Sequence, residues 1–413
     1  MKYYQRLDCR LCGSKKIESV LKLSSTPPAD SFLSEERLNS PQEKIPLELY
    51  LCKDCGNTQI GHVIDGEEVY LNYIYETSST LGLGEHFKDC AADIMNKFKP
   101  RKGGLVLDIG SNDGILLKHF KDHGMNVLGV DPMPGIAKRA KENGVQTLEA
   151  FFNLDLTKKI IEEHGLPSVI CSNNLVADTD DLFSFVSNVK KLMDDRTIFF
   201  FESFYFYLQV KNNVWDFTYH EHYSYFTIKP LSKFFKKLGM EIIDVKTNLT
   251  KGGSFRATVQ LQGGIRQVSP NVKAFIKKEE EEGFQKKKVF KKYAQQIQRG
   301  KTEYLDFMKT LKNGRKKIVG YGACATATTL MYHYEMDGTL DYLVDDFTAK
   351  HNLYSPGMKI PVYPSEEIYN NKPDYIIILA WRYYKKIIDR HTKFLESGGK
   401  FVIPLPKLKI VSK

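Results

Sequence analysis

Short apolar runs alternate with amphipathic segments along the middle of the chain. The apolar runs predict buried strands, and they lie at 105–108, 126–130, 168–172 and 197–202, with a further short strand before Phe151. Apolar positions spaced three and four residues apart predict helices between them, at 85–98, 115–122, 135–143 and 158–163. Such alternation is typical of a doubly wound α/β domain with a largely parallel sheet.

A second pattern of the same type begins after Gly314. Apolar runs at 317–322, 340–344 and 375–380 predict parallel strands, and a helix follows the first of them. The charged stretch 273–312 predicts a helical region whose apolar stripe faces the core, namely Phe284, Tyr293, Ile297, Tyr304, Leu305 and Met308. The pattern therefore predicts two α/β units joined by a helical region.

The length of the chain predicts two or three domains. With 413 residues it exceeds what one hydrophobic core usually organises, and we expect domains at 1–80, 81–265 and 266–413. No apolar run reaches the length of a membrane span, and residues 1–6 lead into charged residues instead of an apolar signal segment. We therefore expect a cytoplasmic protein without a membrane partner, and the sequence leaves its oligomeric state open.

A net charge of +10 raises the question of nucleic-acid binding. The lysines are widely spread, and the densest group, at 286–292, follows Glu279 to Glu282 in what we predict to be one solvated helical stretch. We therefore expect no nucleic-acid partner. The mild basicity is compatible with a phosphorylated small-molecule substrate.

Four of the seven cysteines stand in two C-x-x-C-G motifs, Cys9 with Cys12 and Cys52 with Cys55. Each motif offers two thiolates, so that together they complete one tetrahedral zinc site. Because no coordination position stays open, the metal is predicted to be structural and not catalytic. Disulfides are the alternative, which a reducing compartment disfavours.

An apolar strand runs into a glycine turn at 108–114, and a helix begins directly after it. Backbone N–H groups at such a helix start let a polar ligand approach closely. The next strand ends on Asp131, whose carboxylate is placed to accept hydrogen bonds from ribose hydroxyls. The turn has Asn112 where a pyrophosphate requires a glycine, and Asp113 beside it suits a cationic amino-acid moiety.

These features predict S-adenosylmethionine as the ligand, with a turn used only for packing as the alternative. The turn resembles the acidic-x-Gly-x-x-x-Gly loop of class I methyltransferases. The predicted cofactor-binding residues are Asp108, Gly110, Asn112, Gly114, Asp131, Phe152 and Asn173. A second turn, at 320–322, predicts either another nucleotide-sized cradle or a structural turn.

Histidines, phenols and a carboxylate gather at 215–226, between the two α/β units. An imidazole next to a carboxylate makes a base whose tautomer and pKa a neighbour can set. A His-x-His metal site is the alternative, but it needs a third ligand that the sequence does not identify. A methyl donor beside such a base suggests an acceptor that first loses a proton, and tyrosine hydroxyls can hold an enolate oxygen. The proposed base is His222, assisted by Tyr219 or Glu221.

Together, these motifs resemble the three-part sugar-nucleotide C-methyltransferases of deoxysugar pathways. The resemblance is carried by the paired cysteine motifs, the loop 108–114, Asn173 with Asn174, and the segments 219–226, 252–254 and 320–323. It implies an N-terminal zinc-binding and substrate-binding region, a central S-adenosylmethionine domain of the class I Rossmann-like type and a C-terminal Rossmann-like domain. It also implies methylation of a keto-deoxyhexose, attached to a nucleoside diphosphate, at the carbon beside the ketone.

The resemblance implies site residues as well. By position the histidine base maps to His222, the assisting residues to Tyr219 and Glu221, and a linker tyrosine to Tyr75. The chain departs from the family pattern at Asp178, Lys251, Cys324 and Thr326. These positions bear on the identity of the sugar and on the acceptor atom. An O-methyltransferase and a noncatalytic zinc-knuckle scaffold are the rival functions.

Overall fold

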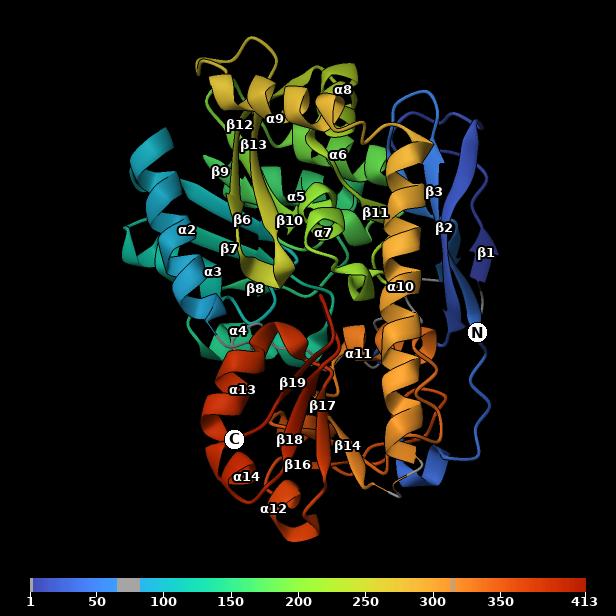
Figure 1. Ribbon diagram of the computed structural model, residues 1–413. Helices are drawn as coiled ribbons and strands as arrows, with labels where there is room; N and C mark the ends of the chain where they lie inside the picture. Colours follow the sequence, from blue (N-terminus) through green and yellow to red (C-terminus); the bar gives the residue numbers. More distant parts are fainter. Residues whose placement is uncertain (1–2, 65–81, 313, 315) are drawn as a thin grey trace.

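The computed structural model describes residues 3–64, 82–312, 314 and 316–413 (Figure 1). Its central domain contains a sheet of seven described strands in the order β12-β13-β10-β9-β6-β7-β8. These strands are β6 (Leu105–Ile109), β7 (Asn126–Val130), β8 (Thr147–Leu148), β9 (Val169–Cys171), β10 (Ile198–Phe204), β12 (Met240–Asn248) and β13 (Ser254–Leu261). β13 runs antiparallel to both of its neighbours, and the other pairs in the sheet are parallel.

Helices cover both faces of this sheet. The helices of the central domain are α2 (Leu83–Phe98), α3 (Ile115–Asp122), α4 (Pro134–Glu142), α5 (Leu154–His164), α6 (Leu182–Lys191), α7 (Phe206–Lys211), α8 (Ile228–Lys237) and α9 (Pro270–Glu281). α2 and α3 bury Phe87 and Phe120 against one face, where Phe200 lies. α6 and α8 bury Val186 and Phe235 against the other face, where Phe199 lies. The alternating pattern thus gives the predicted doubly wound domain, because buried strand side chains on both faces of the sheet pack against helices.

The described residues of the N-terminal part form two small antiparallel sheets. One pairs β1 (Tyr3–Gln5) with β5 (His62–Ile64). The other has the order β11-β4-β3-β2, made of β2 (Ile17–Thr26), β3 (Ile45–Cys52), β4 (Thr58–Ile60) and β11 (Ser224–Tyr225). Since β11 comes from the middle of the chain, the central domain supplies the edge strand of the N-terminal sheet.

The C-terminal domain contains a sheet of six described strands in the order β16-β15-β14-β17-β18-β19. The strands are β14 (Ile318–Tyr321), β15 (Leu343–Asp345), β16 (Val362–Pro364), β17 (Tyr375–Ile378), β18 (Lys400–Ile403) and β19 (Lys409–Val411), and β19 alone is antiparallel in this sheet. The accompanying helices are α11 (Ala325–His333), α12 (Glu367–Asn371), α13 (Tyr384–Arg390) and α14 (Thr392–Glu396). This is the second predicted α/β unit.

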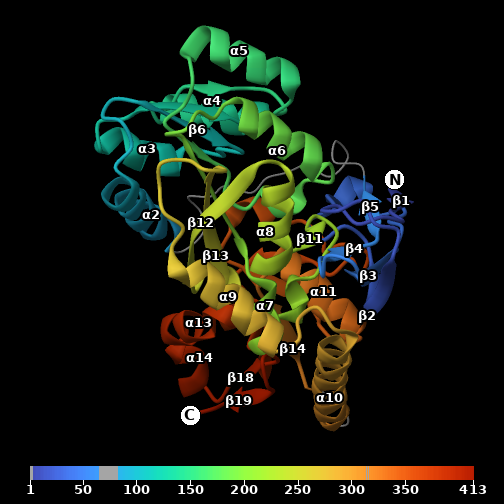
Figure 2. The same cartoon turned by 90° about the horizontal axis from the view of Figure 1, so that it is seen from above.

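A long helix, α10 (Lys287–Lys312), precedes the C-terminal domain and contacts β2 of the N-terminal sheet. Figure 1 shows it running alongside the blue N-terminal strands from the level of the central domain to that of the C-terminal domain, and Figure 2 shows it end-on. Within the described residues, no helix combines the length and apolarity needed to cross a bilayer.

The prediction of one solvated helical stretch across the charge cluster is wrong. α9 ends at Glu281 and α10 begins at Lys287, with Gly283 at a positive φ of 74° between them. Glu279 is fully buried and accepts hydrogen bonds from the backbone N–H groups of Ile228 and Lys229 at the start of α8. The unpaired N–H groups and the positive dipole end at the start of α8 stabilise a carboxylate, which explains why Glu279 is buried.

Candidate active site

A cavity of about 1320 Å³ lies between the three parts of the chain. The N-terminal part contributes Tyr4 and Asp30, the central domain contributes the turn after β6, and the C-terminal domain contributes the loop after β14. A pocket for one small ligand usually measures about 300–1,000 Å³. The volume is therefore large enough for two ligands side by side.

One end of the cavity is formed by the glycine turn after β6. Gly110 has a φ of 77° and its N–H donates to the Val130 carbonyl at 2.8 Å. A Cβ added to Gly110 would lie 2.9 Å from Leu175 Cδ2, so a side chain here would clash as well as be strained. Gly114, also at positive φ, begins α3 but does not line the cavity. The turn is thus shaped by backbone requirements that only glycine meets easily.

Two carboxyl groups flank this turn, at the ends of neighbouring strands. Asp131 accepts the backbone N–H groups of Asn112 and Met133, each at 3.0 Å, which fixes its orientation. Asp108 is buried, and its Oδ1 has no hydrogen-bond partner among the described residues. Burial raises the pKa of Asp108 to about 7 and raises that of Asp131 as well. The unpartnered oxygen of Asp108 would accept a hydrogen bond from a cationic ligand group.

Two further predicted residues close this end of the cavity. Phe152 lines it and stands edge-on to Phe185, with ring centroids 5.5 Å apart. Asn173 follows β9, and its Oδ1 accepts the N–H of Glu202 at 2.8 Å. Of the seven predicted cofactor-binding residues, the cavity lining therefore includes Asp108, Gly110, Asn112, Asp131, Phe152 and Asn173.

His222 faces the same cavity from the segment before β11. Its Nδ1 lies 3.1 Å from the Phe217 carbonyl, which can only accept, so Nδ1 carries the proton and Nε2 keeps its lone pair. Phe204, Phe217 and Tyr219 surround the ring, with the Tyr219 centroid 4.0 Å away. Burial and the charge of Lys251 lower the pKa of His222 to about 3. The imidazole is therefore neutral when the cavity is empty.

Two charged residues that depart from the family pattern lie beside His222. The Nε2 atom is 4.0 Å from Asp178 Oδ1, and this oxygen has no hydrogen-bond partner among the described residues. Burial raises the pKa of Asp178 well above its ordinary value, and burial lowers the pKa of Lys251. Cys324 and Thr326 line the cavity too, so the structure gathers all four departures in one place.

The neighbours of His222 point in different directions. Tyr219 and Glu221 line the cavity, and burial with the nearby charge of Asp30 raises the pKa of Glu221 to about 7. His220 does not line it; its Nε2 lies 3.4 Å from the Pro46 carbonyl. Among the described residues only the cysteine cluster groups three or more metal ligands, so no His-x-His metal group is seen. Tyr75 lies outside the described residues.

Sequence reasoning missed the basic groups that the C-terminal domain supplies. Lys350, Arg382, Lys386 and Arg390 line the cavity. Arg382 donates to Asp216 at 3.0 Å and to Thr326 at 3.0 Å, so it joins the central and C-terminal domains. At the turn after β14, a Cβ on Gly322 would lie 2.5 Å from the Ala380 Cβ. In the sequence, only the weak glycine turn at 320–322 indicates that the C-terminal domain contributes to a ligand site.

The four predicted metal ligands meet at one point. The Sγ atoms of Cys9 and Cys55 are 3.5 Å apart, those of Cys12 and Cys52 are 3.6 Å apart, and all four lie within 4.8 Å of one another. Tetrahedral zinc with Zn–S bonds of about 2.3 Å places its sulfurs roughly 3.8 Å apart. The N–H of Asn57 also points at Cys55 Sγ, at 3.4 Å, as the outer shell of such a site requires. The cluster fits a structural zinc ion.

Three family models match successive parts of the chain. Residues 9–70 match the family described as "Putative zinc binding domain", residues 84–245 match "Methyltransferase domain", and residues 249–406 match "C-methyltransferase C-terminal domain". The C-methyltransferase NovU of Streptomyces niveus is 28% identical over 410 residues, which cover 98% of this chain and 97% of that protein.

Solved structures resemble the chain over less than half of its length. The PH0226 protein of Pyrococcus horikoshii OT3 is 13% identical, with a TM-score of 0.39, and the match covers 48% of this chain and 100% of that one. The magnesium protoporphyrin IX methyltransferase ChlM of Synechocystis PCC 6803 is 13% identical, with a TM-score of 0.34, covering 44% and 81%.

The three matched families follow one another along the chain in the order of the three structural parts, and NovU matches from end to end. The glycine turn with its flanking carboxyls fits S-adenosylmethionine, and the cysteine cluster fits zinc. Successive parts of the chain are thus similar to a zinc-binding domain, a methyltransferase domain and a C-methyltransferase C-terminal domain, and the protein is an S-adenosylmethionine-dependent C-methyltransferase with an N-terminal zinc-binding domain.

Proposed function

We propose that this C-methyltransferase acts on a nucleoside-diphosphate-linked keto-deoxysugar, at the carbon next to the ketone. The observation that carries the proposal is the neutral, oriented imidazole of His222 in the cavity that also contains the glycine turn. Likeness to the C-methyltransferase NovU along the whole chain supports it. The four cysteine thiolates suit a reducing compartment, and we place the reaction in the cytoplasm.

Proton abstraction is assigned to Nε2 of His222. The Phe217 carbonyl holds Nδ1–H, which leaves Nε2 as the basic atom. The imidazolium that forms lies 4.0 Å from Asp178 Oδ1, an acceptor oxygen without another described partner, which stabilises the positive charge. Without such a partner, an imidazole with a pKa of about 3 would be a weak base. Tyr219 or Glu221 assists by hydrogen bonding to the enolate oxygen.

S-adenosylmethionine supplies an electrophilic methyl group when bound. We assign Asp108, Gly110, Asn112, Asp131, Phe152 and Asn173 as the residues that hold it, whereas Gly114, outside the cavity lining, shapes the turn before α3. The electron pair of the broken C–H bond forms the new C–CH₃ bond, while the pair of the S–CH₃ bond stays on sulfur and the proton stays on His222. The methyl group passes directly from the donor to the acceptor, because no protein atom carries it. The donor at the glycine turn and the acceptor at His222 must therefore lie next to each other in the cavity.

The acceptor is proposed to be anionic because the C-terminal end of the cavity is basic. Lys350 pairs with Asp30 at 2.7 Å, Arg382 pairs with Asp216 at 3.0 Å, and Arg390 pairs with Asp346, so much of this charge is already balanced. Arg382, with its fork of donors, and Lys386 lie at the same end. Arginine and lysine groups in a concave site raise the local concentration of a diphosphate.

The test uses methyl-labelled donor, a nucleoside-diphosphate-linked 4-keto-deoxysugar and the variant His222→Gln. We expect label on a carbon of the sugar in the wild type, a fall in kcat of about 10²–10⁴-fold in the variant, and calorimetric donor affinity that stays unchanged. Nuclear magnetic resonance distinguishes a C-methyl from an O-methyl product. His220→Gln is the matched control, since His220 faces Pro46 outside the cavity. Turnover of His222→Gln at the wild-type rate would contradict the assignment of His222 as the base. An O-methyl product would contradict the proposed enolate chemistry.

A further inference from the structure

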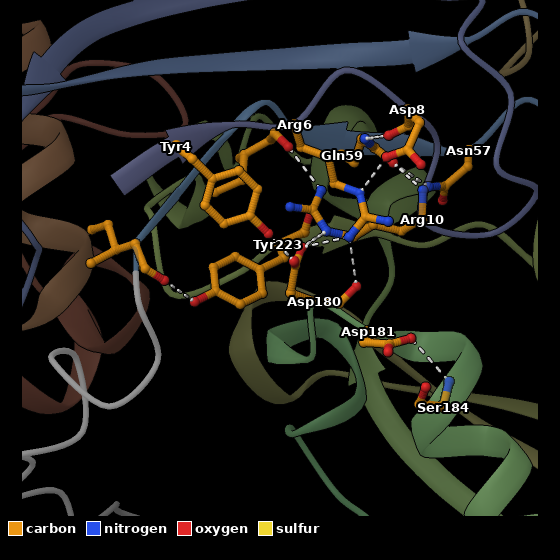
Figure 3. Close-up of polar contacts among 12 residues, drawn as sticks. Tyr4, Arg6, Asp8, Arg10, Asn57, Gln59, Asp180, Asp181, Ser184 and Tyr223 are labelled. Carbon is orange, nitrogen blue, oxygen red and sulfur yellow. Dashed lines mark hydrogen bonds and ion pairs between the residues drawn. The ribbon is translucent and has the colours of Figure 1, made fainter. Parts of the chain in front are cut away.

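A buried arginine stands inside the first cysteine motif, between Cys9 and Cys12. The side chain of Arg10 has no exposed surface, which is unusual for a guanidinium. Figure 3 shows it at the centre of a group of polar side chains from the N-terminal and central domains. A buried charge of this kind is stable only where carboxylates and carbonyls take its protons.

The partners of Arg10 belong to three separate segments. Its Nε donates to Asp180 Oδ1 at 2.7 Å, and its Nη1 donates to the carbonyls of Ile60, at 2.8 Å, and Tyr223, at 3.1 Å. The guanidinium also lies over the Tyr223 ring, 5.3 Å from its centroid. One side chain next to the metal ligands therefore contacts β4, the segment after Asp178 and the segment after His222.

The two segments of the central domain that Arg10 contacts are those that carry the proposed chemistry. Tyr223 follows His222 directly, and Asp180 is two residues beyond Asp178, which ends the 3-10 turn Val176–Asp178. The Tyr223 N–H donates to the Ala177 carbonyl at 2.8 Å, which ties the two segments to each other. Nε2 of His222 and Oδ1 of Asp178 face one another at 4.0 Å across this joint.

We propose that Arg10 is a positioning residue that couples the zinc motif to the spacing of His222 and Asp178. The cysteine motif fixes the backbone of Arg10, and the planar guanidinium then fixes Asp180 and the Tyr223 carbonyl in one geometry. The proposal rests on the role proposed for His222. A displacement of about 1 Å at a reacting group can cost roughly 100-fold in rate, so an arginine without contact to substrate can still control turnover.

Arg6 provides a matched comparison within the same group. Its Nη1 donates to Asp180 Oδ1 at 2.9 Å, and its Nε donates to Asp8 at 2.8 Å, as Figure 3 shows. Among the described residues, no hydrogen bond joins the Arg6 side chain to Tyr223 or to β4. Arg6 therefore binds Asp180, as Arg10 does, but it lacks the bond that Arg10 makes to the Tyr223 carbonyl. Loss of the Arg6 side chain is expected to leave the segment around His222 unchanged.

The experiment compares Arg10→Met, Arg10→Lys and Arg6→Met with the wild type. In Arg10→Met we expect unchanged zinc content by metal analysis and unchanged calorimetric affinity for S-adenosylmethionine. Deuterium exchange of peptides covering 218–226 is expected to rise, and the imidazole titration of His222, followed by nuclear magnetic resonance of labelled histidine, is expected to shift. The kcat is expected to fall by about 10–100-fold, with little change in the KM for donor.

The other two variants keep the test decisive. Arg10→Lys retains a charge for Asp180 but not the fork, so it is expected to recover part of the rate, and it serves if Arg10→Met does not fold. Arg6→Met is expected to leave the exchange of 218–226 as in the wild type. Removing zinc with a chelator is expected to raise exchange in 218–226 as Arg10→Met does.

The outcomes separate this proposal from the proposed function. Exchange and titration need no acceptor. If they change as expected while His222→Gln keeps its turnover, the coupling stands and the assigned base fails. Wild-type exchange and titration in Arg10→Met and Arg10→Lys overturn the coupling. The coupling is also overturned if the Arg10 variants lose zinc to the same extent as they lose turnover, because Arg10 would then act on the metal motif alone.

Discussion

The imidazoles of His220 and His222 lie two residues apart, yet their surroundings differ. His220 meets the Pro46 carbonyl of β3, whereas His222 turns into the cavity with Nδ1 held by Phe217. Both are buried, and burial lowers the pKa of His220 to about 4 and that of His222 to about 3. What distinguishes them is the neighbour of the free nitrogen, because Asp178 faces His222. Of the two histidines in the motif 220–222, only His222 is therefore a candidate base. The contacts with Phe217 and Asp178, which the sequence does not show, identify it.

Donor binding is expected to weaken as the pH falls through about 7. Burial raises the pKa of Asp108 to about 7, so below this pH the carboxyl is neutral and attracts a cationic moiety less. Binding then requires loss of a proton, so affinity should fall about tenfold for each pH unit below 7 and level off above it. His222, with a pKa of about 3, contributes nothing in this range.

Calorimetry with donor alone, from about pH 5.5 to about pH 8.5, measures this dependence. Asp108→Asn is the control, because an amide does not titrate, and its affinity should be low and flat with pH. A wild-type slope that survives in Asp108→Asn would assign the proton to another group.

At the scale of elements, strand pairing and helix starts bring distant segments together. β11 is two residues long, yet it pairs with β4 and fixes the segment that carries His222 against the zinc-binding domain. α9 does the same for α8, because Glu279 accepts the N–H groups of Ile228 and Lys229 and the hydroxyl of Tyr205. Neither contact follows from local periodicity, since each joins residues at least 50 positions apart.

Glu279→Gln is expected to destabilise the protein by about 1–3 kcal/mol. An amide has one acceptor oxygen where the carboxylate has two, so one N–H group at the start of α8 loses its partner, and the attraction between the negative charge and the helix start is also lost. The thermal unfolding midpoint measures the effect. Glu281→Gln on the same helix is the control, because its pair with Lys277 is exposed and worth little. Equal midpoints in the two variants would contradict the capping role.

At the scale of the whole molecule, all three parts of the chain line one cavity. A fully buried carboxylate, Asp216, holds the central domain to the C-terminal one by accepting from Trp381 at 2.8 Å and Arg382 at 3.0 Å. Arg382 in turn lines the cavity, so the joint between the domains is also part of its wall.

Asp216→Asn is expected to loosen this joint. The asparagine keeps one acceptor but not the charge, and the buried guanidinium of Arg382 is left without a counter-ion, at a cost of about 2 kcal/mol or more. Calorimetric unfolding should then show the C-terminal domain melting at a lower temperature, and the KM for the acceptor should rise. Asp306→Asn removes an exposed pair with Lys309 on α10 and should leave the melting unchanged. A single unshifted transition in Asp216→Asn would show that the joint does not depend on this carboxylate.

Much of this architecture could be predicted because its signals are local. The cysteine motifs, the turn after β6 and the buried strands each depend on residue types within a few positions, and the structure confirms both α/β domains and the cysteine cluster. The wall of the cavity could not be predicted in the same way. Arg10, Asp180 and Arg382 act through partners far along the chain, and only the folded molecule brings these together. The roles of the site residues and the domain boundaries at 80/81 and 265/266 stay predictions.

The shared sheet has a consequence for engineered chimaeras. A graft that exchanges the segment before residue 80 for that of a relative would leave β11 of the host to pair with a foreign β4. A mismatch in strand twist or register between β11 and β4 would then displace His222, which lies two residues before β11. Recombination that aims to change the accepted substrate should therefore transplant residues 219–226 together with the cysteine-rich segment.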